Sequence, residues 1–172
     1  MNIVLTGFMG TGKTVIGKLL AQKLSWEYID TDELIEKREN MKISDIFATK
    51  GEPYFRKIET EVVKDVSKKD KCVISTGGGV VLKEENMIAL EKNGIIINLS
   101  ASPEIIFERT SKDKSRPLLN KENPKEEIMK LLNFRAPYYD RCALKINTDD
   151  SDPEKNVRKI LDFLKSKCNF QI

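Results

Sequence analysis

Residues 7–14 read Gly7-Phe8-Met9-Gly10-Thr11-Gly12-Lys13-Thr14, which fits the pattern GxxxxGK[ST]. The apolar run Ile3–Thr6 precedes this loop, and a helical pattern, Lys13–Leu24, follows it. A strand, a glycine-rich loop and a helix in this order indicate a phosphate-binding P-loop. The glycines let backbone N–H groups approach an anion, and the helix directs its positive end toward it. The alternative, a glycine turn with an incidental lysine, is disfavoured by the two flanking elements.

Short apolar runs alternate with longer amphipathic stretches along the rest of the chain, with Gly51 and Gly94 where helices should stop. This alternation predicts an α/β fold, a parallel sheet with helices on both faces and right-handed crossovers. We expect strands at Ile3–Thr6, Glu27–Ile29, Cys72–Thr76, Ile95–Leu99 and Leu144–Asn147, and helices at Lys13–Leu24, Asp32–Glu39, Pro53–Ser67, Glu84–Lys92, Pro103–Thr110, Lys125–Asn133 and Pro153–Lys167.

Composition narrows the classes of function. The chain has 172 residues and a formal net charge of +3, which suits a single domain over residues 1–172 and demands no nucleic-acid-binding surface. It has no histidine, so a Ser-His or Cys-His dyad is excluded and a metal would be held mainly by oxygen ligands. The three cysteines form no CxxC pair, which indicates neither zinc nor disulfides. No stretch approaches the roughly 18–20 apolar residues of a membrane span, and we expect a cytoplasmic protein.

The segment Ser111–Pro124 is long, polar and contains Arg116. Structureless connections of this length are often lids or binding loops. We expect a lid over approximately residues 111–124. The alternative for the segment taken alone is a solvated surface excursion.

Two further clusters follow predicted strands, where ligands gather in α/β sheets. Tyr28-Ile29-Asp30-Thr31-Asp32 places two carboxylates at a strand end. One could face Mg²⁺ and the other a substrate hydroxyl, or Asp30 or Thr31 could simply cap the next helix. Thr76-Gly77-Gly78-Gly79 follows another strand, and three glycines allow backbone to lie against a ligand, although a loose turn would use them too.

Four arginines stand in distinctive surroundings: Arg56, Arg109, Arg116 and Arg135. Each one, taken singly, is more typical of a solvated surface arginine. Glu59 follows Arg56 by three residues and would serve equally well as a surface partner.

Taken together, these motifs resemble shikimate kinases. The P-loop, Asp-Thr-Asp, Phe-Arg-x-x-Glu, Gly-Gly-Gly, Arg-Pro-Leu-Leu and Arg-x-x-x-Tyr occur in the family's order over roughly residues 1–165. The resemblance implies a P-loop kinase fold with a five-stranded sheet in the order 2-3-1-4-5 and a lid. It also implies a reaction: ATP and shikimate give ADP and shikimate 3-phosphate, with Mg²⁺, on the chorismate route to aromatic amino acids. The enzyme would act as a monomer.

The resemblance also assigns roles to residues. Lys13, Asp32 and Arg116 would be catalytic, with Asp32 accepting the proton of the attacked hydroxyl. The clamp on the shikimate carboxylate would be Arg56 and Arg135, with Glu59 as a partner of Arg56. The pocket floor would be Gly77, Gly78 and Gly79. Thr14 and Asp30 would lie at Mg²⁺. ATP would contact Gly10, Thr11, Gly12, Lys13, Thr14, Val15, Arg116 and, on the adenine side, Arg109.

One departure from the family pattern concerns the adenine side. Members often carry a basic residue shortly before the proline of the last loop, whereas Asp149-Asp150-Ser151-Asp152-Pro153 is acidic here. Whether Arg158 substitutes is left open by the sequence.

Rival functions are weaker. The Arg56–Gly79–Arg135 set argues against a gluconate or nucleoside monophosphate kinase. A GTPase-type switch would need a guanine-reading Asn-Lys-x-Asp motif, which the chain lacks. A noncatalytic module with a relict P-loop is disfavoured because Lys13 and Thr14 are intact.

Overall fold

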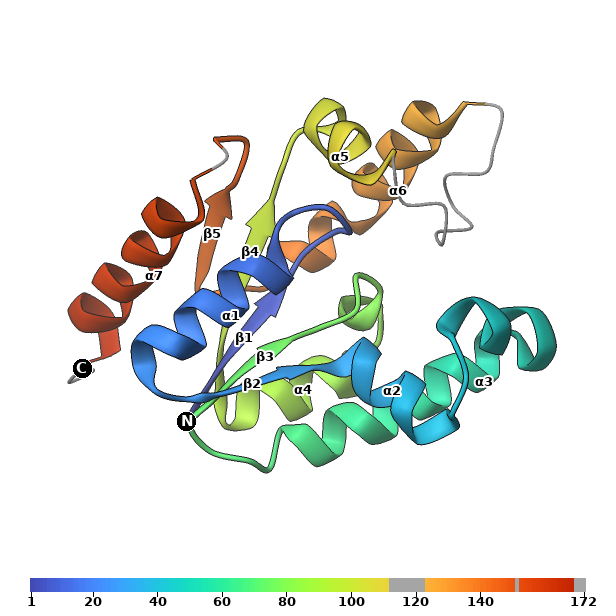
Figure 1. Ribbon diagram of the computed structural model, residues 1–172, viewed down its shortest axis with the longest axis horizontal. Helices are drawn as coiled ribbons and strands as arrows, with labels where there is room; N and C mark the ends of the chain where they lie inside the picture. The colour runs from blue at the N-terminus through green and yellow to red at the C-terminus, as the bar shows by residue number, and fades with distance from the viewer. Residues whose placement is uncertain (112–122, 151, 169–172) are drawn as a thin grey trace.

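A computed structural model describes residues 1–111, 123–150 and 152–168 of the chain. Within these residues, five parallel strands form one sheet in the order β2-β3-β1-β4-β5. This is the predicted fold class and strand order (Figure 1). The strands are β1 (Asn2–Thr6), β2 (Glu27–Asp30), β3 (Cys72–Ser75), β4 (Gly94–Ser100) and β5 (Leu144–Asn147).

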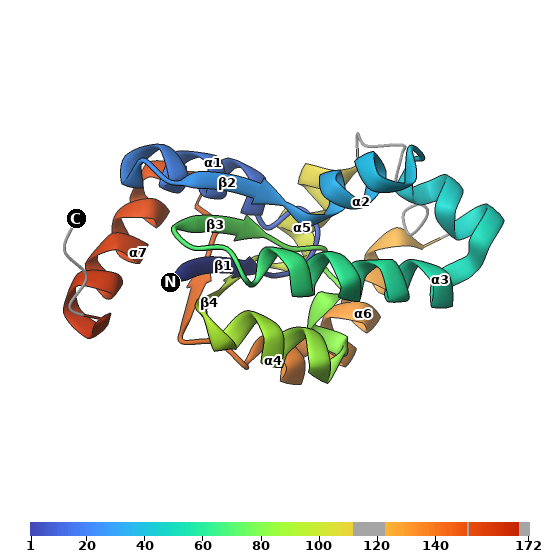
Figure 2. The ribbon, with the colours of Figure 1, turned by 90° about the horizontal axis from the view of Figure 1, so that it is seen from below.

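Helices cover both faces of the sheet, with α1 on one side and α3 and α4 on the other (Figure 2). The helices are α1 (Lys13–Leu24), α2 (Thr31–Glu39), α3 (Ile43–Val66), η1 (Val80–Leu82, a 3₁₀ turn), α4 (Glu84–Lys92), α5 (Pro103–Thr110), α6 (Pro124–Tyr139) and α7 (Pro153–Cys168). Most of the predicted elements agree with these bounds to within one residue at each end, because local apolar periodicity specifies them.

The central strand β1 is buried on both faces, which explains its continuous apolar sequence. Ile3 and Leu5 join one core cluster together with residues of α1 and α7, such as Leu20. Val4 points to the other face and joins a cluster with residues of α3 and α4, such as Val63. Because side chains alternate along a strand, β1 anchors both layers and fixes the position of the loop that follows it.

The prediction for α3 was wrong at its beginning. A helix was expected from Pro53, but helical structure begins at Ile43 and is broken at Gly51, whose φ of 81° and ψ of 167° are not helical. Gly51 does stop a helix, as predicted, and Pro53 opens the next one. The first of these two helices was missed because its contribution to the core is small: of residues 43–50 only Ile46 is fully buried.

The prediction for α6 was wrong at its end. The helix continues through Pro137 to Tyr139 instead of stopping at Asn133. A proline inside a helix removes one backbone hydrogen bond and costs about 3 kcal/mol. Tertiary packing of Tyr139, which is buried, compensates for that cost, and the sequence pattern alone could not show this.

Residues 112–122 lie outside the described residues. They include Arg116 and most of the predicted lid, so both remain predictions. None of the described helices is long and apolar enough to cross a membrane.

Candidate active site

The loop between β1 and α1 has the backbone geometry of an anion cradle. Gly7, Gly10 and Gly12 all have positive φ angles, of 139°, 76° and 89°. A Cβ atom on Gly7 would lie only 2.2 Å from the carbonyl oxygen of Leu99 in β4. Only glycine fits there, since a side chain would collide with backbone. The predicted P-loop therefore lies at the carboxyl ends of β1 and β4, as a phosphate site in this fold requires.

Lys13 and Thr14 begin α1, directly below the loop. The ammonium group of Lys13 donates hydrogen bonds to the carbonyl oxygens of Gly7 and Phe8, both at 2.9 Å. Thr14 is exposed in the first turn, and the N-cap residue Gly12 has no side chain to satisfy the first N–H groups of the helix. Positive charge and free backbone donors thus meet at one point.

Beside the loop lies a pocket of about 190 Å³. Arg109 of α5 closes one side of it, donating to the carbonyl oxygen of Gly10 at 3.2 Å and to that of Thr148 at 2.6 Å. Val15 is 57% exposed and contributes an apolar wall. The lining comprises Thr11, Gly12, Val15, Ile16, Arg109, Thr148, Asp150, Pro153 and Asn156. Arg109, predicted to lie on the adenine side, is therefore next to the P-loop and in this pocket.

The described acidic residues before Pro153 are engaged within the protein, and one of them, Asp152, caps α7. Asp149 accepts a hydrogen bond from the N–H of Ser102, just before α5, at 2.7 Å. Asp152 accepts one from the N–H of Glu154 in the first turn of α7 at 3.0 Å. Arg158 is exposed and is not among the residues that line the pocket.

Asp30 is the N-cap of α2. Its Oδ1 accepts from the N–H groups of Asp32 and Glu33, at 3.0 and 3.4 Å, and the Tyr28 hydroxyl donates to its Oδ2 at 3.1 Å. Asp30 therefore caps α2, as expected from one of the two interpretations of this cluster. Burial, together with the charge of Asp30, raises the pKa of Tyr28 to about 12, so Tyr28 remains a neutral donor. Sequence reasoning missed this contact.

The Gly77–Gly79 turn lies against Thr31 and against two predicted site residues, Asp32 and Arg56. The N–H of Gly77 donates to the Thr31 hydroxyl at 3.2 Å. A Cβ atom on Gly77 would lie 2.6 Å from Oδ1 of Asp32, and one on Gly79 would lie 2.5 Å from Nη1 of Arg56. A side chain in place of either glycine would force these charged groups to shift, so the turn is packed directly against Asp32 and Arg56.

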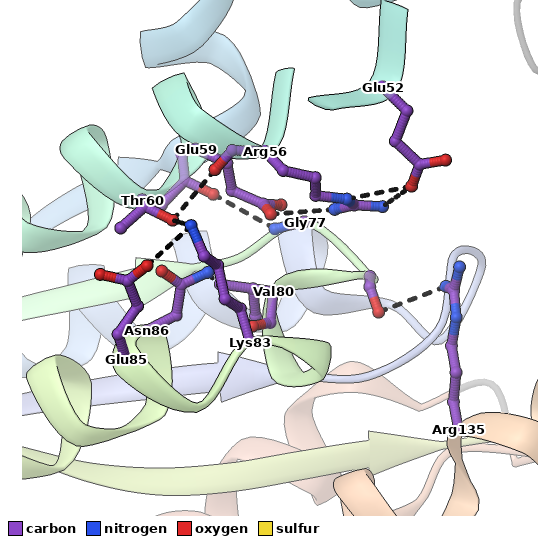
Figure 3. A network of polar contacts seen from close by, with 12 residues as sticks. Glu52, Arg56, Glu59, Thr60, Gly77, Val80, Lys83, Glu85, Asn86 and Arg135 are labelled. Atoms are coloured by element: carbon purple, nitrogen blue, oxygen red, sulfur yellow. Dashed lines mark hydrogen bonds and ion pairs between the residues drawn. The ribbon is translucent and has the colours of Figure 1, made fainter. Parts of the chain in front are cut away.

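Arg56 extends from α3 along this turn and is held by two carboxylates (Figure 3). Its Nη1 donates to Glu59 at 2.9 Å, and its Nε and Nη2 donate to Glu52, both at 3.2 Å. Glu59 is only 1% exposed. Burial raises the pKa of Glu59, and the Arg56 charge opposes that shift. The pair is therefore a buried support, not a surface ion pair.

Arg135 approaches the same turn from α6 (Figure 3). Its Nη1 donates to the Gly78 carbonyl at 3.3 Å, and its guanidinium carbon lies 5.5 Å from the centre of the Phe8 ring. Its Nε is buried without a hydrogen-bond partner among the described residues. The Tyr139 hydroxyl donates to the same carbonyl at 2.6 Å. The Arg-x-x-x-Tyr spacing could have indicated that Tyr139 belongs to the site.

The two halves of the site adjoin. A Cβ atom on Gly78 would lie 3.4 Å from the carbonyl oxygen of Gly7 and 3.6 Å from Nη1 of Arg135. The phosphate cradle thus abuts a turn that carries a carboxylate and two arginines. This sheet order and this pairing of sites define a kinase of the P-loop class.

Comparison with known proteins identifies the family. The family model described as Shikimate kinase matches residues 9–165. The shikimate kinases of Thermodesulfovibrio yellowstonii and Caldicellulosiruptor bescii are each 51% identical over 160 residues, which span 93% of this chain and 92% and 93% of the relatives. The structure of shikimate kinase from Acinetobacter baumannii in complex with shikimate aligns with a TM-score of 0.93 at 37% identity, covering 96% of this chain and 93% of that one. This chain belongs to the shikimate kinase family.

Proposed function

We propose that this chain transfers the γ-phosphoryl group of ATP to the 3-hydroxyl of shikimate, giving ADP and shikimate 3-phosphate, within aromatic amino acid biosynthesis. One observation carries the proposal: Arg56 and Arg135 converge on the Gly77–Gly79 turn beside the P-loop. A planar guanidinium binds a carboxylate through paired hydrogen bonds. This arrangement suits an acceptor molecule that carries a carboxylate and binds next to the phosphate site.

The nucleotide side follows from the P-loop. Backbone N–H groups of Gly10–Thr14 hold the phosphates, and Lys13 neutralises charge on the β- and γ-phosphates. The two hydrogen bonds from Lys13 to the carbonyls of Gly7 and Phe8 hold its ammonium group at the loop. Phosphoryl transfer depends mostly on positioning and charge neutralisation, which this cradle supplies.

Mg²⁺ fits the donors present. The described residues contain no group of three or more acidic or cysteine side chains that could hold a metal by themselves. Mg²⁺ usually takes few protein ligands and keeps water and substrate phosphates, and that agrees with an exposed Thr14 hydroxyl at the cradle. Asp30 lies nearby in the site but already accepts three hydrogen bonds, so it would act through bound water. When bound, Mg²⁺ would neutralise phosphate charge.

On the acceptor side, Asp32 lies against Gly77. We assign it the role of accepting the proton of the attacked hydroxyl, since the chain has no histidine to do so. Glu59 holds Arg56 in its orientation. The other edge of the guanidinium is bonded to Glu52 and becomes available to the substrate carboxylate when Glu52 moves away. The two arginines and the carboxylate of Asp32 would thereby fix opposite ends of the acceptor.

A coupled ADP-release assay tests the proposal. Purified protein is supplied with ATP, Mg²⁺ and, in separate reactions, shikimate, gluconate or a nucleoside monophosphate. Of the three acceptors, we expect only shikimate to be turned over, and mass spectrometry should detect shikimate 3-phosphate as the product. Faster turnover with gluconate or a nucleotide would overturn the proposal.

A further inference from the structure

The first turn of α7 contains a buried polar side chain without a partner. Asn156 is 2% exposed, and its carbonyl oxygen Oδ1 is buried without a hydrogen bond to any described residue. Buried polar groups in native proteins are nearly always paired, so an exception calls for an explanation. The next residues that α7 buries, Val157 and Ile160, are apolar and belong to the core. Asn156 is therefore an unusual choice at this position.

Asn156 lines the pocket beside the P-loop. The other polar residues of the described lining have their hydrogen bonds within the protein. The Thr11 hydroxyl donates to Phe8, the Thr148 hydroxyl is within hydrogen-bonding distance of the Thr11 and Ser100 carbonyls, and Arg109 is bound to Gly10 and Thr148. Asp150 forms an ion pair with Lys155. Of the described lining residues, Asn156 is the one whose polar side chain makes no hydrogen bond.

The position of the pocket indicates which part of a nucleotide it receives. Thr11 and Gly12 belong both to the pocket and to the P-loop, so a nucleotide with its phosphates on the P-loop would extend its base here. Ile16 and Pro153 offer apolar contact, and the planar guanidinium of Arg109 can stack on a flat ring. The Asn156 side chain lies in the wall of this pocket and is only 2% exposed, so its carboxamide has to turn toward the pocket to meet the edge of the base.

We propose that the Asn156 carboxamide recognises the adenine of ATP through hydrogen bonds. Its carbonyl accepts from the 6-amino group, and its NH₂ donates to the adjacent ring nitrogen. Asparagine side chains recognise adenine in this paired manner in nucleic-acid complexes. Asn156 is thus a specificity-determining residue for the nucleotide, a role that rests on the proposed function and deepens it.

The experiment compares ATP with purine riboside 5′-triphosphate, which lacks the 6-amino group. The variant Asn156→Leu keeps the shape of the side chain and removes both hydrogen-bonding groups. For the wild type we expect the purine analogue to have a higher KM than ATP. In Asn156→Leu the KM for ATP should rise about 10-fold, the KM for shikimate should be unchanged, and the preference for ATP over the analogue should fall toward one.

Asn86 supplies a matched control. It is also fully buried, with an unpaired Oδ1, but it lies in α4 outside the pocket. Asn86→Leu should leave the preference for ATP over the analogue unchanged. The inference would be overturned if the wild type had the same KM for ATP and for the purine analogue, or if Asn156→Leu still preferred ATP. Asn156 would then be merely structural.

Two measurements keep the inference apart from other failures. If Asn156→Leu does not fold, the wild-type comparison of the two triphosphates still decides. If the wild type proves inactive on shikimate, the proposed function fails. Recognition of the base can still be tested by comparing, with calorimetry, the affinities for ADP and for purine riboside diphosphate. Equal binding of the two diphosphates would then refute it.

Discussion

Replacing Arg135 by alanine is the sharpest probe of the acceptor site. Among the described residues, Arg135 donates a hydrogen bond to the Gly78 carbonyl, and its Nε has no partner there. Because a guanidinium has five N–H donors, most of its capacity remains for a ligand. Arg56 is a poorer choice, since its removal would strand the buried carboxylate of Glu59, and an unpaired buried charge is strongly destabilising.

The size of the effect follows from the bonds that are lost. A hydrogen bond to a charged group contributes about 1.5–3 kcal/mol, which corresponds to about 10–150-fold in affinity. We expect Arg135→Ala to raise the KM for shikimate by that factor and to leave the KM for ATP nearly unchanged. Arg135→Lys should restore only part of the affinity, because a point charge cannot reproduce the planar fork.

The assay is steady-state kinetics with each substrate varied in turn, with an analogue that carries an amide in place of the shikimate carboxylate. The wild type should lose affinity for the amide. The variant should lose much less, because the partner of the carboxylate is already gone. If Arg135→Ala instead weakens ATP and leaves shikimate unaffected, Arg135 belongs to the nucleotide side and the reasoning fails.

Three further predictions concern single residues. Lys13→Ala should abolish turnover while circular dichroism shows a native fold, and near-normal turnover would contradict the P-loop assignment. Asp32→Asn should lower kcat by about 10²–10⁴-fold with little change in ATP binding, whereas a loss below about tenfold would exclude a catalytic role. Burial raises the pKa of Glu59, so the folded state binds the proton of this carboxyl group more tightly than the unfolded state does. Its contribution to stability is present at low pH and is lost as pH rises through the folded-state pKa. The free energy of unfolding, measured in urea, should fall from about pH 5 to about pH 7.5 by more in the wild type than in Glu59→Gln. An equal decrease in the two proteins would count against this prediction.

Local patterns predicted most of the fold. The P-loop, the strand ends and most helices carry their own signals, which are apolar periodicity, glycine spacing and caps. The wrong end of α6 lies where a tertiary contact overrides the local pattern: Pro137 is inside α6 because Tyr139 is buried beyond it. Such compensation depends on residues far away in the chain, such as Gly78, which accepts a hydrogen bond from Tyr139. The wrong beginning of α3 has another cause, since residues 43–50 bury only Ile46 and carry a weak apolar signal.

The candidate site was predictable only in part. Each arginine looked like a surface residue in the sequence, and only the resemblance grouped Arg56 with Arg135. Physical reasoning on spacing could not do so, because helices on different parts of the chain bring them to one turn. Tyr28 and Asn156 were missed because neither belongs to a motif. What marks them is a hydroxyl contact with Asp30 and an unpaired buried carbonyl.

The acidic loop before Pro153 and the buried Asn156 both suit the binding of a neutral base. Two carboxylates of that loop point at helix N-termini, where negative charge is favourable, and a third is paired with Lys155. Their charges are thus largely engaged before a nucleotide arrives. Adenine carries no charge, so an ionic partner would gain little from it, whereas a carboxamide matches its donor and acceptor edge. Lys13 and the start of α1 can then act on the phosphates, while the base is stacked on Arg109 and selected by its hydrogen bonds to Asn156.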